Sequence, residues 1–323
     1  MTVLVTGGAG FIGSNLAEAL VIDGQRVRVL DDLSTGSRVN LTDDAEVVTG
    51  DVRDPATVMD AVGDAEVVYH LAALTSVTRS VRDPVTTNDV NVRGTLTVLE
   101  AARQAGVRRV VYASSSSVYG DTEVLPKHEG LPANPVSPYG VSKLAGEAYC
   151  RDFTRVHGLE TVALRFFNVF GPRQDPRSEY AAVIPRFIPR MLAGEPPVVF
   201  GDGEQTRDFT FVDDAVTVCL SAADAGPDAS GEAINVSGGG RISILDLIGL
   251  LNRVLGTKVA PEHERPRPGD VRHSHADLGK AERLLGYRPS VPIEEGLART
   301  AEWFDGRPSV APRSEPTMTT RGV

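Results

Sequence analysis

The segment SPYGVSK places a tyrosine, Tyr139, four residues before a lysine, Lys143. Residues four apart lie on one face of a helix, so the phenol and the ammonium would be neighbours. Ser137 can cap such a helix, and Pro138 suits its first turn. A nearby ammonium favours the phenolate, which could then exchange a proton with a hydroxyl group. Taken alone the pattern is weak, because a tyrosine and a lysine at this spacing are often an ordinary surface pair.

A short apolar run at the N-terminus, TVLVT, leads into the glycine-rich segment TGGAGFIGSN. Glycines in such a turn let the backbone approach a pyrophosphate and let the next helix pack close to the strand. That helix presents free N–H groups and the positive end of its dipole to the phosphates. The order of strand, glycine turn and helix therefore predicts a dinucleotide site. Its expected residues are Gly7, Gly10, Phe11, Ile12 and Gly13.

The second apolar run, RVRVL, ends at two aspartates, Asp31 and Asp32. An acidic side chain at this strand end bonds the adenosine ribose hydroxyls of NAD and repels the 2′-phosphate of NADP. We therefore expect NAD as the cofactor, with Asp31 as the ribose ligand. The third run leads into GDVRD, where Asp51 and Val52 are expected to lie beside the adenine.

A bound NAD gives the tyrosine and lysine pair a reaction to catalyse. Tyr139 would exchange a proton with a substrate hydroxyl while hydride passes to or from the cofactor. Lys143 would lower the pKa of the tyrosine and hold the nicotinamide ribose. The segment ASSSSVYGD follows another apolar run, and a serine there could hydrogen-bond the reacting oxygen.

Apolar runs alternate with helical patterns through the first half of the chain. Alternation of this kind favours an α/β fold in which helices cover both faces of a parallel sheet. We expect a Rossmann-type doubly wound domain over residues 1–165, with a return segment at about 207–236. A smaller C-terminal α/β substrate lobe is expected over 166–206 and 237–304, and a disordered tail over 305–323. The predicted strands are TVLVT, RVRVL, EVVTG, EVVYHLA, RVVYASS and TVALRF.

The composition excludes several classes of protein. A net charge of −10 over 323 residues argues against a sequence-independent nucleic-acid binder. Cys150 and Cys219 are too few for a disulfide framework and are expected to be free thiols. No apolar stretch is long enough to span a bilayer. Because MTVLVTGG is predicted to enter a strand at once, we expect no signal peptide. We expect a cytoplasmic protein without a metal ion.

The chain resembles an extended short-chain dehydrogenase/reductase of the UDP-sugar 4-epimerase type, as far as about Trp303. The resemblance is carried by TGGAGFIGSN, DDLSTG, GDVRD, HLAA, SSSSVYG, PYGVSK, FFNVFGPRQDP, QTRDFTFVDD and RPGDVRHSHADLGKAERLLGY. It implies that Ser115, Tyr139 and Lys143 are catalytic. It adds to the NAD site Ser34, Gly36, Leu71, Ala72 and Ala73. It implies a UDP-sugar site made of Thr75, Ser115, Ser116, Ser117, Asn168, Arg177, Val183, Arg207, Arg267, Asp270 and Ser274.

Within this resemblance the choice of reaction depends on Ser116 and Ser117. Related 4,6-dehydratases and uronate decarboxylases carry an acidic residue in this motif, so the serines disfavour those reactions. We expect oxidation at C4, rotation of the 4-keto sugar and re-reduction. A 4-ketoreductase that consumes NADH remains an alternative, as does a non-catalytic NAD-binding regulator. The resemblance also implies a homodimer, paired through helices near 92–105 and 140–155.

Two residues bear on the identity of the sugar. A serine at Ser274, where the family has its gatekeeper, leaves room for an N-acetyl group at C2. Arg177 could pair in fork geometry with a C6 carboxylate, which would suit UDP-glucuronate. An arginine in a proline-rich loop is usually solvated, so UDP-hexoses and their N-acetylated forms are favoured over the uronate.

Overall fold

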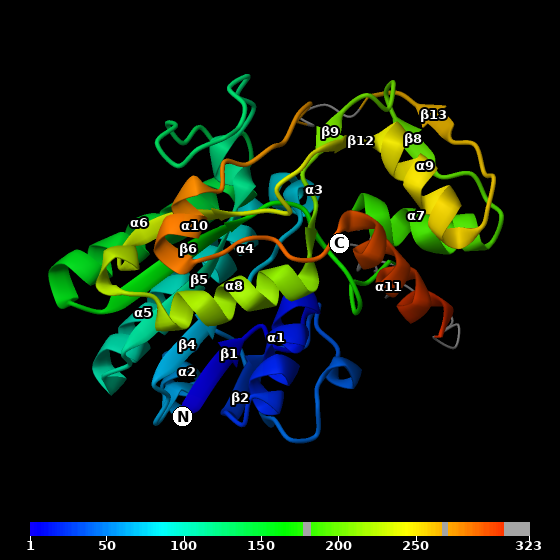
Figure 1. The fold of residues 1–323 in the computed structure, drawn as a ribbon. Coiled ribbons are helices and arrows are strands. Elements are labelled where there is room, and N and C mark those ends of the chain that lie inside the picture. Colours follow the sequence, from blue (N-terminus) through cyan, green and yellow to red (C-terminus); the bar gives the residue numbers. More distant parts are fainter. Residues whose placement is uncertain (177–181, 267–270, 307–323) are drawn as a thin grey trace, which may run out of the picture.

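The computed structural model describes residues 1–176, 182–266 and 271–306, and it is built around a seven-stranded sheet (Figure 1). All paired strands of this sheet run parallel. The order confirms the expected doubly wound α/β class, because the chain reverses direction across the sheet between β1 and β4. Across the sheet the strands are β11 (Glu232–Val236), β6 (Glu160–Phe166), β5 (Arg109–Ser115), β4 (Val67–His70), β1 (Thr2–Thr6), β2 (Arg26–Asp31) and β3 (Glu46–Thr49).

In the inner strands of the sheet, alternate residues enter two different cores. In β1, Val3 and Val5 pack into one core and Leu4 packs into the other. Successive side chains of a strand point to opposite faces, so a strand buried on both faces must be apolar throughout. This is the physical reason that TVLVT and RVVYASS lack a polar alternation.

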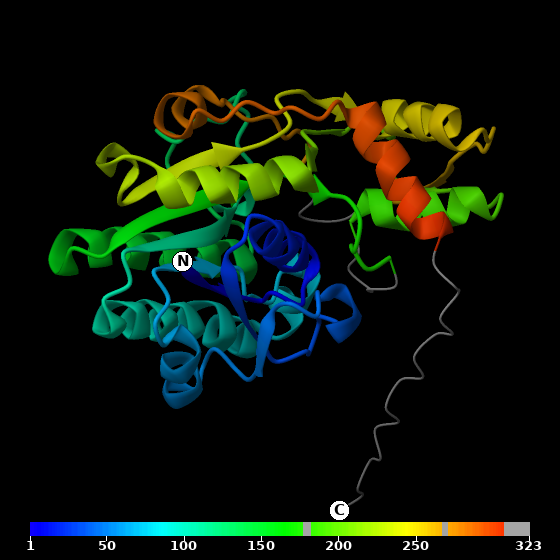
Figure 2. The ribbon, with the colours of Figure 1, turned by 60° about the horizontal axis from the view of Figure 1, so that its bottom comes forward.

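Helices cover both faces of the sheet (Figures 1 and 2). The helices α1 (Phe11–Ile22), α8 (Val212–Asp224) and α10 (Gly279–Leu285) contribute to the core that contains Val3. The core that contains Leu4 is covered by α2 (Pro55–Val62), α5 (Gly94–Ala105) and α6 (Pro138–His157). Two short helices, α3 (Val77–Arg82) and α4 (Pro84–Asn88), pack beside α6.

The helical stretch that contains α4 and α5 is interrupted in the structure. A π-helical turn, Asp89–Arg93, separates α4 from α5. Within it the buried side chain of Asn91 accepts a hydrogen bond from Leu74 N (2.7 Å) and donates one to Leu74 O (3.0 Å). A π turn often lies at a functional site, and here it carries an amide that holds the loop after β4.

The second lobe lies beyond β6 and has its own apolar core, which includes Phe170, Phe187, Phe211 and Leu247. Its helices are α7 (Val183–Leu192), α9 (Ile244–Leu255) and α11 (Ile293–Asp305). Its strands form pairs: β7 (Val169–Phe170) with β10 (Thr210–Phe211), β8 (Val198–Phe200) with β13 (Glu262–Glu264), and β9 (Thr206–Arg207) with β12 (Ile242–Ser243). Between these segments the chain returns to the large sheet, where it adds α8 and β11. Short 3₁₀ turns occur at Arg38–Asn40, Ser116–Tyr119 and Pro227–Ala229.

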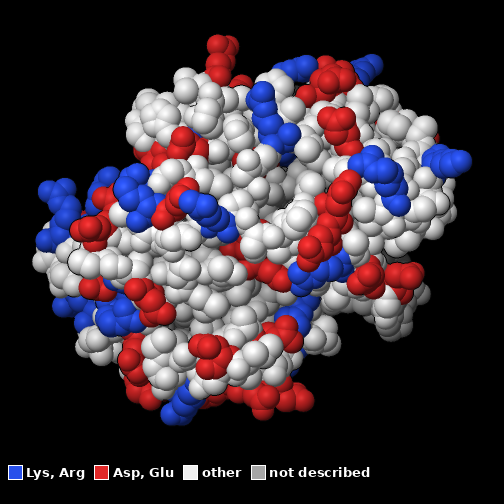
Figure 3. All heavy atoms as spheres, viewed as in Figure 1, with Lys and Arg blue, Asp and Glu red and all other residues white. Residues whose placement is uncertain are grey.

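Positive and negative side chains are interleaved over the face of the molecule shown in Figure 3. Both cysteines, Cys150 and Cys219, are buried free thiols. Among residues 1–176, 182–266 and 271–306, no helix has the length and apolar character needed to cross a membrane. The expected tail lies outside the described residues from residue 307 onward.

Candidate active site

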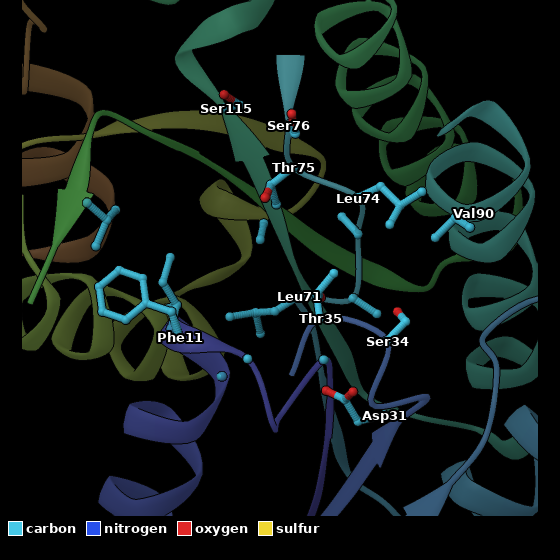
Figure 4. Close-up of a pocket in the computed structure, with 18 of the residues that line it drawn as sticks. Phe11, Asp31, Ser34, Thr35, Leu71, Leu74, Thr75, Ser76, Val90 and Ser115 are labelled. Atoms are coloured by element: carbon cyan, nitrogen blue, oxygen red, sulfur yellow. The ribbon is translucent and has the colours of Figure 1, made fainter. Parts of the chain in front are cut away.

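A cavity of about 1580 Å³ lies along the carboxyl ends of β1, β2, β4 and β5. Asp31 and Ser34 lie at one end of it and Ser76 and Ser115 at the other, with Leu71 between them (Figure 4). Ligands of doubly wound sheets bind at this edge, where the strand order reverses. The expected cofactor residues that line the cavity are Gly7, Gly10, Phe11, Ile12, Gly13, Asp31, Asp32, Ser34, Asp51, Val52, Leu71, Ala72, Ala73, Tyr139 and Lys143. Gly36 instead packs against Ala9.

The turn after β1 has a shape that only glycine allows at two positions. Gly7 has a φ of +69°, and a Cβ there would lie 2.6 Å from Ala72 N. A Cβ on Gly13 would lie 2.2 Å from Gly7 O, inside the turn itself. Because the backbone is this compact, the first turn of α1 opens directly onto the cavity. That geometry fits the pyrophosphate of a dinucleotide.

Asp31 is held rigidly at the end of β2. One carboxylate oxygen accepts a hydrogen bond from Ala9 N (2.9 Å), and the other accepts one from Leu33 N (2.8 Å). Burial raises the pKa of Asp31, and these two N–H donors oppose that rise. Each oxygen keeps a further lone pair, so the carboxylate can also accept ribose hydroxyls. Asp32, by contrast, is exposed and accepts both the backbone N–H and the hydroxyl of Ser34.

We expect Asp31→Ala to weaken NAD binding by about tenfold or more, the cost of losing hydrogen bonds to a charged acceptor. Discrimination against NADP should relax as well, because the negative charge beside the ribose 2′-position is lost. Titration of NAD and of NADP against the purified protein measures both effects. Asp32→Ala is the matched control and should change both affinities less. Equal affinity of the unaltered protein for NAD and NADP would show that the role given to Asp31 is wrong.

At the end of β3, Asp51 is paired with a neighbouring cation. The Arg53 guanidinium donates to both carboxylate oxygens, and these hydrogen bonds lower the pKa of Asp51. Arg53 also bonds Asp89 in the π-helical turn (2.9 Å). Val52 is buried and lines the cavity wall. The apolar side chain and the anchored carboxylate suit the flank of an adenine ring.

Helix α6 begins at Pro138, as the sequence indicates. Its cap is Ser137, whose hydroxyl accepts Gly140 N (3.1 Å). Tyr139 and Lys143 are both almost fully buried and both line the cavity. Ser115, the last residue of β5, lines the same cavity. A strand end and a helix start far apart in sequence thus bring the three expected catalytic side chains to one place.

The pKa values of Tyr139 and Lys143 differ from the expectation that the lysine lowers the pKa of the tyrosine. Burial lowers the pKa of Lys143 to about 8 and raises the pKa of Tyr139. A hydrogen bond from Ser115, and not the lysine, opposes the rise at Tyr139. The reason is geometric: Lys143 Nζ lies 6.0 Å from the centre of the tyrosine ring and donates to Ala113 O (2.7 Å). The chain's own groups therefore keep the phenol neutral.

The expected substrate residues divide into three sets. Thr75, Ser115, Ser116, Ser117 and Asn168 line the cavity. Three others lie outside the cavity lining: Val183, Arg207 and Ser274. Val183 begins α7, and Arg207 donates to the carbonyls of Thr206 and Arg272. Ser274 is buried, and its backbone N–H donates to Thr206 O. Arg177, Arg267 and Asp270 lie outside the described residues. The roles given to all of them remain predictions.

Several lining residues escaped sequence reasoning, above all Arg173, Gln174 and Asp175. They follow β7 in the motif FFNVFGPRQDP, where only Asn168 had been assigned a role. The signal was present, because a glycine, a proline and two polar residues after a strand mark a loop at its carboxyl end. Leu74 and Ser76, in the loop after β4, were missed in the same way.

A doubly wound sheet, a glycine cradle, an acidic residue after β2 and a buried tyrosine–lysine pair are the features of an NAD-dependent short-chain dehydrogenase/reductase. Comparison with known proteins makes the assignment more specific. The chain belongs to the NAD dependent epimerase/dehydratase family, whose model matches residues 3–237. NAD is the cofactor of this family, and the cradle and Asp31 fit it.

Individual relatives match over nearly their whole length. A UDP-glucose 4-epimerase of Mycolicibacterium smegmatis is 44% identical over 94% of this chain and 98% of its own. A UDP-glucose 4-epimerase of Thermotoga maritima, solved with UDP-glucose, has a TM-score of 0.91 at 39% identity and covers 94% and 99% of the two chains. A UDP-N-acetylglucosamine 4-epimerase of Methanobrevibacter ruminantium, solved with UDP-N-acetylmuramic acid, has a TM-score of 0.90 at 39% identity, covering 94% and 98%.

Proposed function

We propose that the protein is an NAD-dependent 4-epimerase of UDP-hexoses. Its substrates would be UDP-glucose and UDP-galactose, their N-acetylated counterparts, or both. The observation that carries the proposal is the meeting of Ser115, Tyr139 and Lys143 in the same cavity as the glycine cradle. The names of the Mycolicibacterium and Thermotoga relatives support the same reaction.

The described residues suit the proton transfer that such a reaction needs. Tyr139 first loses its own proton to solvent; as the phenolate it takes the proton of the C4 hydroxyl and returns it after the sugar has turned, while Ser115 hydrogen-bonds the same oxygen. Lys143 lies one turn further along α6 and favours the phenolate once substrate and cofactor exclude water. When bound, NAD would supply the hydride acceptor for oxidation at C4 and, as NADH, the hydride donor for re-reduction. The burial of Tyr139 and Lys143 limits their exchange of protons with bulk water.

Hydroxyl groups at the end of β5 favour epimerisation over dehydration. Ser116 and Ser117 follow Ser115 and line the cavity, in the place where related dehydratases carry an acidic residue. Without a carboxylate in this motif, removal of the C5 proton lacks its base. Asn168, with a φ of +33°, donates its side-chain amide to Asp208 O (2.9 Å) and is proposed to hold the diphosphate while the sugar rotates.

We further propose that the chain divides into an NAD-binding domain, residues 1–165 with 207–236, and a substrate lobe, residues 166–206 and 237–304. Cytoplasmic localisation is proposed from the two buried, unpaired cysteines, because free thiols are typical of a reducing compartment. A homodimer is proposed through α5 and α6, which pack side by side. Exposed apolar side chains on α6, Val141 and Val156, support that choice of surface.

The proposed reaction is tested by incubating the purified protein, without added NAD, with UDP-glucose, UDP-N-acetylglucosamine and UDP-glucuronate in separate assays. We expect the C4 epimer of UDP-glucose or of UDP-N-acetylglucosamine, because the cofactor is regenerated in each cycle. The products are resolved by chromatography and identified by NMR of the sugar. Epimerisation of UDP-glucuronate alone would move the assignment to the uronate. In a parallel assay with added NAD, formation of one NADH for each 4-keto sugar would identify a 4-ketoreductase running in reverse. Bound NAD without turnover in either assay would identify a regulator.

A further inference from the structure

The segment Gly171–Asp175, which follows β7, is attached to the cofactor-binding helix α1. Arg173 donates from Nη1 to Ser14 O (3.0 Å) and from Nη2 to Glu18 Oε2 (2.7 Å). From the other side, Asn15 Nδ2 donates to Pro172 O (3.2 Å). These bonds join residues more than 150 positions apart in the sequence. They connect the start of the second lobe to the helix whose first turn forms the glycine cradle.

The backbone of this segment adopts conformations that need support. Arg173 has a φ of +72°, the left-handed region that side-chain-bearing residues rarely adopt, and Gly171 has a φ of +152°. A strained residue persists when its surroundings hold it, and such residues gather at functional sites. Here the hydrogen bonds from the Arg173 guanidinium to α1 provide that support.

The same segment forms a wall of the cavity. Arg173, Gln174 and Asp175 line it together with Gly10 and Phe11 of the cradle. The amide of Asn15 also bonds Phe11 O (2.9 Å), so the attachment and the cradle share the first turns of α1. A dinucleotide seated on the cradle would therefore lie beside this segment.

We propose that Arg173 is a positioning residue that slows the release of NAD. Its hydrogen bonds to Ser14 and Glu18 hold the segment Gly171–Asp175 against α1, and this segment keeps the dinucleotide in the cavity from one turnover to the next. An epimerase regenerates its NAD in each cycle, so slow release serves the reaction. The inference rests on the proposed function only in that respect, because release of NAD can be measured without any sugar substrate.

The experiment compares Arg173→Met with Arg108→Met. Arg108 likewise donates to a backbone carbonyl, Ala223 O (2.9 Å), and forms an ion pair with Asp224 (3.7 Å), but it lies outside the cavity lining. Each protein is loaded with isotope-labelled NAD and passed over a desalting column, and release is followed after an excess of unlabelled NAD. We expect release from Arg173→Met to be about tenfold faster, the effect of one or two lost charge-assisted hydrogen bonds. Arg108→Met should release NAD at the unaltered rate.

A second readout separates retention from folding. Activity of Arg173→Met on the sugar that the unaltered protein accepts should depend on added NAD, and its thermal midpoint should remain well above the assay temperature. If Arg173→Met does not fold, Glu18→Gln replaces it, since that change spares the bond to Ser14 and should speed release by about threefold. Release of NAD at the unaltered rate from the folded variant, or equal acceleration in Arg108→Met, overturns the proposal. Failure of every sugar to react would overturn the proposed function but leave the release rates interpretable.

Discussion

Replacing Tyr139 by phenylalanine is expected to slow epimerisation by about a hundredfold or more, the usual contribution of a positioned general base or acid. The ring is 9% exposed, so phenylalanine preserves its packing and removes only the group that carries the proton. NAD should remain bound, because the cradle and Asp31 are untouched. The turnover number on UDP-glucose or UDP-N-acetylglucosamine and the NAD content of the purified protein are the two measurements.

Tyr149→Phe is the matched control for that variant. Tyr149 lies on the same helix, is partly buried in the core around α5 and α6, and lies outside the cavity lining. Its replacement should leave turnover unchanged. Turnover of Tyr139→Phe close to that of Tyr149→Phe would rule out the phenol as the proton carrier and with it the proposed mechanism.

Replacing Gly13 by alanine is expected to abolish NAD binding and to destabilise the fold. The added Cβ would lie 2.2 Å from Gly7 O and 2.8 Å from Gly8 Cα, and these are backbone atoms of the cradle. Relief requires the turn to open, and overpacking of this kind costs about 1–3 kcal/mol or more. The thermal midpoint measures the loss of stability, and the NAD content of the purified protein measures the loss of binding.

Two further glycines separate folding from binding. In Gly10→Ala the added Cβ would approach only Gly7 O, at 3.1 Å, so this variant should fold normally. It should still bind NAD weakly, because Gly10 lines the cavity. Gly249→Ala, in the interior of α9, meets nothing within 4 Å and should raise stability by about 0.5–1 kcal/mol. A Gly13→Ala protein that has the same thermal midpoint as the unaltered protein and retains NAD would disprove the steric account of the cradle.

Features that depend on local pattern could be predicted from the sequence. Continuous apolar runs such as TVLVT predict strands buried on both faces, and the structure places TVLVT between β4 and β2, inside the sheet. The glycine turn after β1 and the aspartate after β2 were also readable, because each needs a particular residue at a particular strand end. The capped start of α6 was recognisable from Ser137 and Pro138 for the same reason.

Features that depend on residues distant in sequence became visible only in the folded chain. Nothing near Asn91 in the sequence indicates its hydrogen bonds to Leu74, because Leu74 lies on another loop. The attachment of Arg173 to α1 likewise needs a partner on a helix more than 150 residues earlier. The pKa of Tyr139 follows from its burial and from where Lys143 Nζ points, and neither is encoded in the spacing of four residues. Local pattern determines which elements form, whereas charge, strain and contact at the site arise only when those elements pack.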